Sequence, residues 1–234
     1  AGIIIEIGKN VNDFEVGNHV VPSYVASCGK CDMCKNGRPA LCEPATISNA
    51  KAVLLDGTTR LKKDGEIIHH HSGVAGFAEY AVLPREALVK IDNDIPFEHA
   101  ALFGCGVVTG VGAVINTANA REEDSVAIVG LGGVGLSALL ASLAVGSKKT
   151  IAIDLSDEKL TLARELGADH TLNPKDENFL EKIRDLTSGG VNIAVETAGS
   201  GHALKTAYDI TRRGGTTVTA VSYTHLRAHE TACN

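Results

Sequence analysis

The pattern of apolar and polar positions changes near residue 125. Beyond that point, short apolar runs alternate with stretches of helical character, which is typical of a parallel sheet with right-handed helical crossovers. The strand-like runs are Val126–Val129, Thr150–Asp154, His170–Leu172, Val191–Glu196 and Thr216–Val221. We therefore predict an α/β domain over residues 115–221, built on a doubly wound parallel sheet of about five strands.

Residues that begin and end helices fit this domain. Ser156 precedes two acidic residues and is predicted to cap the N-terminus of a helix. Gly167 and Gly214 stand where C-terminal caps are expected, because glycine readily adopts a left-handed conformation.

Residues 1–114 follow a different pattern. Residues 3–27 contain apolar or β-branched runs at Ile3–Ile5 and His19–Val21, separated by glycines. Residues 43–72 are polar and predict no regular structure, and Gly76–Val82 resumes a strand pattern. We predict a β-rich domain here.

Three histidines lie inside the irregular stretch, at His69, His70 and His71. Because a purification tag stands at a terminus, we interpret them as a solvated loop or a partly buried polar cluster.

The stretch Val126–Gly146 has no charged side chain and is long enough to cross a membrane. Four glycines in its first ten residues would weaken a spanning helix. They fall where a strand must turn into a helix beside a phosphate, so we favour the strand–turn–helix interpretation.

Composition restricts the class of protein. The chain has 234 residues, of which 44% are hydrophobic and 21% charged, and this is typical of a globular protein. Its net charge of −6 disfavours nucleic acid and anionic membranes as partners, so small molecules or proteins are expected. The first ten residues lack the features of a secretory signal, which favours the cytoplasm.

Four cysteines have the spacing C-x2-C-x2-C-x7-C, at Cys28, Cys31, Cys34 and Cys42. Four thiolates saturate a tetrahedral zinc ion and leave no position for substrate, so such a site is structural. Disulfides are a weaker alternative, because short spacings strain most pairings. A nucleic-acid-binding zinc ribbon is also weaker, since few basic residues and no aromatic residues lie between the cysteines.

A glycine fingerprint follows the first strand of the α/β domain. It comprises Gly130, Gly132, Gly133, Val134 and Gly135 and leads from strand to helix, as dinucleotide binding requires. There, glycines permit a tight turn, close approach of the pyrophosphate, and packing of the helix on the strand.

Asp154 ends the next strand of the α/β domain. A carboxylate at that position accepts hydrogen bonds from the adenosine ribose and repels a 2′-phosphate, which favours NAD over NADP. The alternative is an ordinary acidic residue beside a helix.

The chain resembles the zinc-dependent medium-chain alcohol dehydrogenases. The resemblance rests on the four clustered cysteines, Gly104-Cys105-Gly106, Thr109-Gly110, the glycine fingerprint and Asp154. It implies a Rossmann-type domain, and a partial GroES-like catalytic domain over residues 1–114 with a structural zinc lobe at 28–42.

The resemblance also implies roles for residues that the spacing leaves open. From sequence alone, Cys105 is a lone cysteine of ordinary hydrophobic character. By resemblance, Cys105 is a ligand of a catalytic zinc, Thr109, Val134, Asp154 and Lys159 lie against NAD, and Tyr24 lines the substrate pocket. The implied assembly is a homodimer or homotetramer.

The chain departs from the family at both ends. By resemblance, the other catalytic-zinc ligands precede residue 1, so we expect little or no turnover from this chain. Residues 222–234 resemble a translated sequencing adaptor, and we expect them to be non-native. The pair His225 and His229 in that tail lacks the glutamate of a metalloprotease motif, which disfavours a zinc site there.

The sequence therefore predicts an NAD-dependent zinc alcohol dehydrogenase that converts an alcohol to an aldehyde or ketone. A non-catalytic module that binds NAD and zinc remains the alternative, together with the less favoured zinc-ribbon interaction protein.

Overall fold

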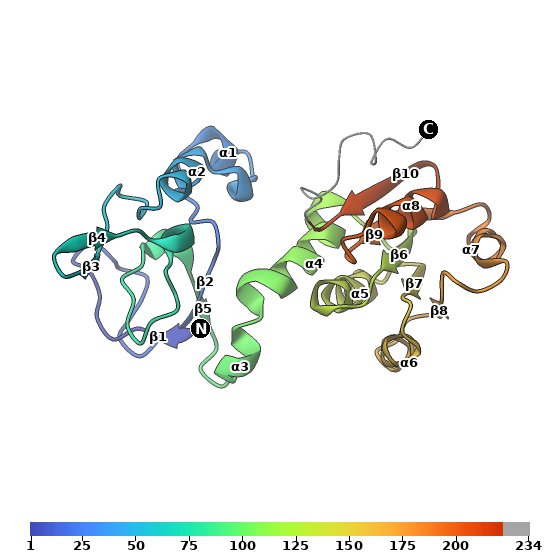
Figure 1. The fold of residues 1–234 in the computed structure, drawn as a ribbon, viewed down its shortest axis with the longest axis horizontal. Helices are drawn as coiled ribbons and strands as arrows, with labels where there is room; N and C mark the ends of the chain where they lie inside the picture. Colours follow the sequence, from blue (N-terminus) through green and yellow to red (C-terminus); the bar gives the residue numbers. More distant parts are fainter. Residues whose placement is uncertain (222–234) are drawn as a thin grey trace. The chain divides into compact units, whose positions relative to one another are not determined.

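The computed structural model describes residues 1–221, and the predicted non-native tail with its two histidines lies outside the described residues. The chain forms two units, which divide after Cys105 (Figure 1). This division comes earlier in the chain than the boundary expected after residue 114. Each unit is described by itself.

The first unit contains a three-stranded antiparallel sheet in the order β1-β2-β5 and a separate hairpin of β3 and β4. The strands are β1 (Gly2–Ile3), β2 (His19–Pro22), β3 (Leu61–Lys63), β4 (Glu66–Ile68) and β5 (Leu88–Ile91). The helical segments are α1 (Asp32–Lys35), η1 (Pro39–Leu41), α2 (Glu43–Ala50), η2 (His71–Gly73), η3 (Arg85–Ala87) and α3 (Phe97–Ala100). A β-rich domain was predicted for this region, and the fold class is confirmed.

Two predictions about this unit are wrong. The segment 43–72 is not irregular, because it contains α2 and the hairpin β3–β4. Gly76–Val82 forms no strand, since no neighbouring strand within residues 1–221 pairs with it. Its large side chains Phe77, Tyr80 and Val82 are exposed.

The histidine cluster is partly buried, in line with its interpretation from sequence. His70 is 1% exposed, whereas His69 and His71 are exposed. The His70 backbone N–H donates to Ala52 O at 2.8 Å, and its Nε2 accepts from the Arg60 backbone N–H at 3.1 Å. His70 therefore joins both ends of the segment between α2 and the hairpin.

The second unit is built on a five-stranded parallel sheet in the order β10-β9-β6-β7-β8. Its strands are β6 (Ser125–Val129), β7 (Lys149–Ile153), β8 (His170–Leu172), β9 (Val191–Glu196) and β10 (Thr211–Thr219). Its helical segments are α4 (Val108–Gly112), the π-helical turn η5 (Ala113–Thr117), α5 (Gly133–Val145), α6 (Asp157–Glu165), α7 (Phe179–Thr187) and α8 (Gly201–Ile210). The π-helical turn η4 (Phe103–Val107) spans the division. The predicted doubly wound sheet is confirmed.

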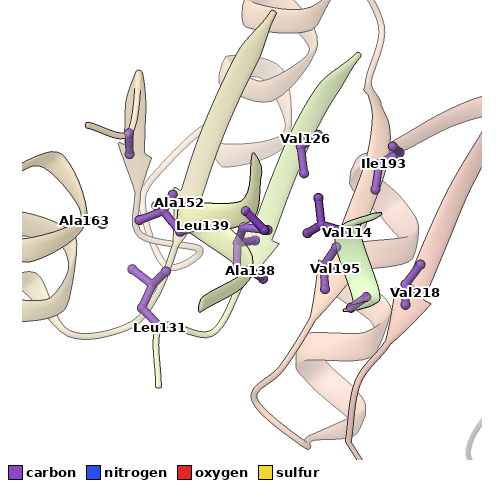
Figure 2. Packing of buried hydrophobic residues seen from close by; sticks show 14 of the residues in the cluster. Val114, Val126, Leu131, Ala138, Leu139, Ala152, Ala163, Ile193, Val195 and Val218 are labelled. Carbon is purple, nitrogen blue, oxygen red and sulfur yellow. The ribbon is translucent and has the colours of Figure 1, made fainter. Parts of the chain in front are cut away.

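Both faces of this sheet are buried. On one face, Val126 and Ile128 pack with residues of α5, α6 and η5, as Figure 2 shows for Val126, Leu139 and Val114. On the other face, Ala127 and Val129 pack with residues of α7 and α8. Burial on both sides explains why the strands are continuous apolar runs and not alternating ones.

Of the three predicted caps, two are confirmed. The Ser156 side chain accepts from Lys159 N at 3.4 Å, and Gly167 has a φ of +110° just after α6. Gly214 caps no helix, because α8 ends at Ile210 and Gly214 lies in an irregularity of β10, where the register shifts between Thr211 and Thr216.

The stretch Val126–Gly146 contains β6, a turn and α5, so it is not a single spanning helix. One helical run in the described chain, Phe97–Thr117, is long and apolar enough to cross a membrane by length and composition. Core helices of globular proteins meet the same criterion, so this observation is weak.

Candidate functional site

The first candidate site is the cluster of four cysteines. Helix ends hold these residues, since Cys31 precedes α1, Cys34 lies within α1, and Cys42 precedes α2. All four Sγ atoms lie within 4.8 Å of one another, and the Sγ atoms of Cys31 and Cys42 are 3.9 Å apart. A tetrahedral ion with Zn–S bonds of about 2.3 Å requires sulfur–sulfur distances of roughly 3.8 Å. The cluster therefore fits zinc.

Backbone amides prepare this cluster for a metal. The Sγ of Cys28 accepts from the backbone N–H groups of Lys30 at 3.4 Å and Cys31 at 3.3 Å, which lowers the pKa of Cys28 to about 6. Burial and neighbouring thiols raise the pKa of Cys34 to about 12. Thiolates are the metal-binding form of cysteine, so the donors aimed at Cys28 favour metal binding there.

Among residues 1–221 the structure brings together one cluster of this kind. Cys105 is outside it and is exposed. Tyr24 is also exposed, with its carbonyl accepting from Asn49 Nδ2 at 3.4 Å.

The second candidate site is the turn that joins β6 to α5. Gly130 has a φ of +95°, a conformation that glycine adopts readily. No side chain caps α5 at Gly132, so the first N–H groups of the helix are available to a ligand. No atom lies within 4 Å of a Cβ added at Gly132 or Gly133, so the turn is open at these two positions. Such a helix N-terminus favours a diphosphate.

The last fingerprint glycine, Gly135, brings α5 against the sheet. A Cβ on Gly135 would lie 1.9 Å from Gly130 O, which no side chain could tolerate. The roles predicted for Gly130 and Gly135 thus have a geometric basis, and the turn fits a dinucleotide.

Asp154 lies beside this turn at the end of β7, and its side chain is 11% exposed. Its Oδ2 accepts from Leu131 N at 2.7 Å, and its Oδ1 accepts from Ser156 N at 2.9 Å. Lys159 Nζ lies 3.8 Å from Oδ2, so the structure brings together the two residues expected near the adenosine ribose.

Thr109 belongs to the same unit as the turn. The residue after it, Gly110, packs so closely on α5 that an added Cβ would lie 2.2 Å from Val134 O. Thr109 and Val134, predicted separately to lie near NAD, are thereby held on two adjoining helices.

Sequence reasoning missed Thr197, which follows β9 directly. Its Oγ1 donates to Gly130 O at 2.6 Å. The order of the strands supplies the signal that could have found it, because β9 neighbours β6 and its end must lie near the turn.

Two family models and many known proteins match this chain. The family Alcohol dehydrogenase GroES-like domain matches residues 1–93, and the family Zinc-binding dehydrogenase matches residues 133–225. An S-(hydroxymethyl)glutathione dehydrogenase of Synechocystis is 38% identical over 92% of this chain and 58% of its own length.

Solved structures give the same result. An alcohol dehydrogenase zinc-binding domain protein from Burkholderia ambifaria has a TM-score of 0.84 and 35% identity. Benzyl alcohol dehydrogenase from Acinetobacter calcoaceticus has a TM-score of 0.77 and 37% identity. Each match covers 93% of this chain and 59% of the other chain.

The chain belongs to the zinc-dependent medium-chain alcohol dehydrogenase family. Zinc and NAD are the cofactors of this family, and the geometry of the four-cysteine cluster fits a zinc ion. The chain spans less than two thirds of the length of the relatives described above.

Proposed function

We propose that the protein carrying this chain is an NAD-dependent zinc alcohol dehydrogenase, which transfers hydride reversibly from a primary or secondary alcohol to NAD and yields an aldehyde or ketone. One observation carries the proposal: a four-thiolate cluster with zinc spacing and an open glycine turn beside a carboxylate occur in the same chain. The first stabilises a lobe of the family's catalytic domain, and the second suits a dinucleotide.

In this proposal the residues of the nucleotide-binding unit orient the cofactor. The N–H groups at the start of α5 bind its diphosphate, and Asp154 accepts from the adenosine ribose with Lys159 beside it. Thr109 positions the nicotinamide end and the substrate hydroxyl. These contacts lower the entropic cost of bringing the reactants together.

The family resemblance also suggests roles for two residues of the first unit. Cys105 supplies a thiolate ligand, and Tyr24 contributes to the substrate pocket. A catalytic zinc, when bound, supplies a Lewis acid for the substrate oxygen.

The substrate classes to assay follow from the relatives. One relative is an S-(hydroxymethyl)glutathione dehydrogenase and another a benzyl alcohol dehydrogenase, so glutathione-adduct and aromatic alcohols should be compared with aliphatic ones. We also propose a reducing compartment such as the cytoplasm, because four clustered free thiols persist there. The proposed assembly is a homodimer or homotetramer.

A non-catalytic module that binds NAD and zinc is the second candidate for this chain by itself. It is favoured by the single cluster of metal ligands among residues 1–221, which excludes Cys105. A catalytic zinc site requires three protein ligands.

Metal analysis combined with turnover tests both proposals. The purified 234-residue chain should contain one zinc, bind NAD and show no alcohol-dependent NADH formation above a Cys105→Ala variant. A longer gene product that carries this sequence should show such turnover and lose it in Cys105→Ala. Turnover that survives this substitution in the longer product would contradict the role of Cys105, and absence of NAD binding would contradict the nucleotide site.

A further inference from the structure

The peptide group between Gly130 and Leu131 is the first of the fingerprint turn. Both of its polar atoms are held by side chains from neighbouring strands. Its carbonyl oxygen, Gly130 O, accepts from Thr197 Oγ1 at 2.6 Å, and its N–H, on Leu131, donates to Asp154 Oδ2 at 2.7 Å. A peptide plane fixed at both ends cannot rotate without breaking one of these bonds.

The backbone around Thr197 adds to this restraint. Thr197 N donates to Val129 O at 2.9 Å, which extends the pairing of β9 with β6 by one residue. A Cβ on Gly130 would lie 2.8 Å from Ala198 N, so the chain after β9 touches the turn directly. Thr197 is half-buried and lies at the junction of three segments.

The orientation of this peptide determines where the following N–H groups point. Gly130 has a positive φ, and rotation of its peptide would change the direction of the chain through Gly132 into α5. The N–H groups that would receive a diphosphate belong to that segment. The direction of these N–H groups thus depends in part on the Thr197 hydroxyl.

We propose that Thr197 is a positioning residue for the dinucleotide diphosphate, acting through the Gly130 carbonyl. The proposal rests on the NAD site proposed above. Asp154 cannot serve as a clean probe, because it is also expected to contact the ribose. Thr197 is not expected to contact the ribose, and the second acceptor of its Oγ1, Val129 O at 3.2 Å, lies directly before the turn.

The test uses Thr197→Ala, which removes the hydroxyl, and Thr197→Ser, which keeps it. Valine is unsuitable, because its methyl group would occupy the position of Oγ1, 2.6 Å from Gly130 O. The 234-residue chain is titrated with ADP-ribose, which has the diphosphate, and with adenosine, which lacks it.

Thr197→Ala should weaken ADP-ribose binding about three- to tenfold, the range for one lost hydrogen bond, and leave adenosine binding unchanged. Thr197→Ser should restore wild-type affinity. The matched control is Thr211→Ala, since Thr211 Oγ1 donates to Ala207 O at 2.7 Å at the other end of the sheet. This control should leave both affinities unchanged even if it lowers the melting temperature.

Amide hydrogen exchange of the ligand-free chain supplies a second readout. The Leu131 amide should exchange faster in Thr197→Ala than in the wild type or in Thr197→Ser. Equal ADP-ribose affinity together with equal Leu131 exchange in Thr197→Ala would overturn the proposal, as would a parallel loss for adenosine. If the wild-type chain binds no ADP-ribose, the NAD site itself fails, and the Leu131 exchange then decides whether Thr197 holds the turn.

Discussion

Residues 1–105 and residues 106–221 differ in how they are stabilised. Both described clusters of buried apolar side chains lie in the second unit, on the two faces of its sheet. The first unit has short strands and a loop gathered around four thiols, with large exposed side chains such as Phe77 and Tyr80. Apolar burial stabilises one unit, whereas metal coordination is expected to supply much of the stability of the other.

Removal of the metal should have the largest effect and tests whether the first unit depends on it for stability. A zinc chelator, or the Cys42→Ser variant, should abolish hydrogen-exchange protection across residues 28–54 and leave the strands of the second unit protected. Cys42 is fully buried within this lobe. Metal binding is coupled to folding, so without the metal the lobe should unfold and its amides should lose protection.

The control is Cys105→Ser, which changes an exposed thiol outside the cluster. It should retain both the zinc and the protection. Equal loss of hydrogen-exchange protection in both units after chelation would contradict the view that metal coordination stabilises only the first unit.

A core substitution should give the opposite result. Leu139→Ala removes a fully buried side chain of α5 and should lower the free energy of unfolding of the second unit by about 3 kcal/mol, with the zinc content unchanged. Denaturant unfolding followed beside metal analysis measures both quantities.

Leu140→Ala is the matched control, since Leu140 lies next to Leu139 on the same helix and is 48% exposed. It should have a small effect. A similar loss in the two variants would mean that α5 is not packed as described.

The smallest expected effect is the pH dependence of the stability of the first unit, which involves His70. Burial lowers the pKa of His70, and Arg60 lowers it further while Asp56 opposes the shift. A histidine with a lowered pKa binds fewer protons when folded, so its stabilising contribution is complete above about pH 6.5 and is lost as the pH falls below that value.

His70→Gln offers a neutral acceptor to the Arg60 N–H group and cannot titrate. Between pH 7 and pH 5 this variant should lose less stability than the wild type, because it has no group that takes up a proton at this position. His69→Gln, at an exposed position, is the control and should follow the wild-type profile. Parallel profiles for wild type and His70→Gln would remove His70 as the cause.

The two units also differ in how far their sequences predict them. In the second unit, Val191–Glu196 was predicted with its observed bounds, because a strand buried on both faces is a largely apolar run. His170–Leu172 was also predicted with its observed bounds, although this strand is half-buried at the edge of the sheet. Gly214 was misassigned because a glycine with positive φ serves a strand irregularity as well as a helix end.

In the first unit, weak apolar patterns hid real structure. Helix α2 is signalled by Pro44 near its start, and the hairpin β3–β4 by the turn residues Asp64 and Gly65, which have positive φ. These local signals lie in a polar stretch, so they were missed. Gly76–Val82 has the apolar pattern of a strand, but no strand lies beside it in the described residues. A strand pattern therefore predicts a strand only where a pairing partner is available.

The candidate sites were predictable to the extent that they are local in sequence. The four cysteines and the glycine turn lie within short segments, and the structure brings each together. The contribution of Thr197 depends on contact between segments some 67 positions apart, which spacing does not reveal.

The approach of Gly135 to the Gly130 carbonyl has an evolutionary consequence. A side chain at Gly135 would displace the Gly130 carbonyl, so a substitution there would disturb both the turn and the packing of α5. Exposed side chains such as Tyr24 are under no comparable packing restriction. Within this family, substitutions should therefore accumulate at exposed positions such as Tyr24 sooner than at Gly135.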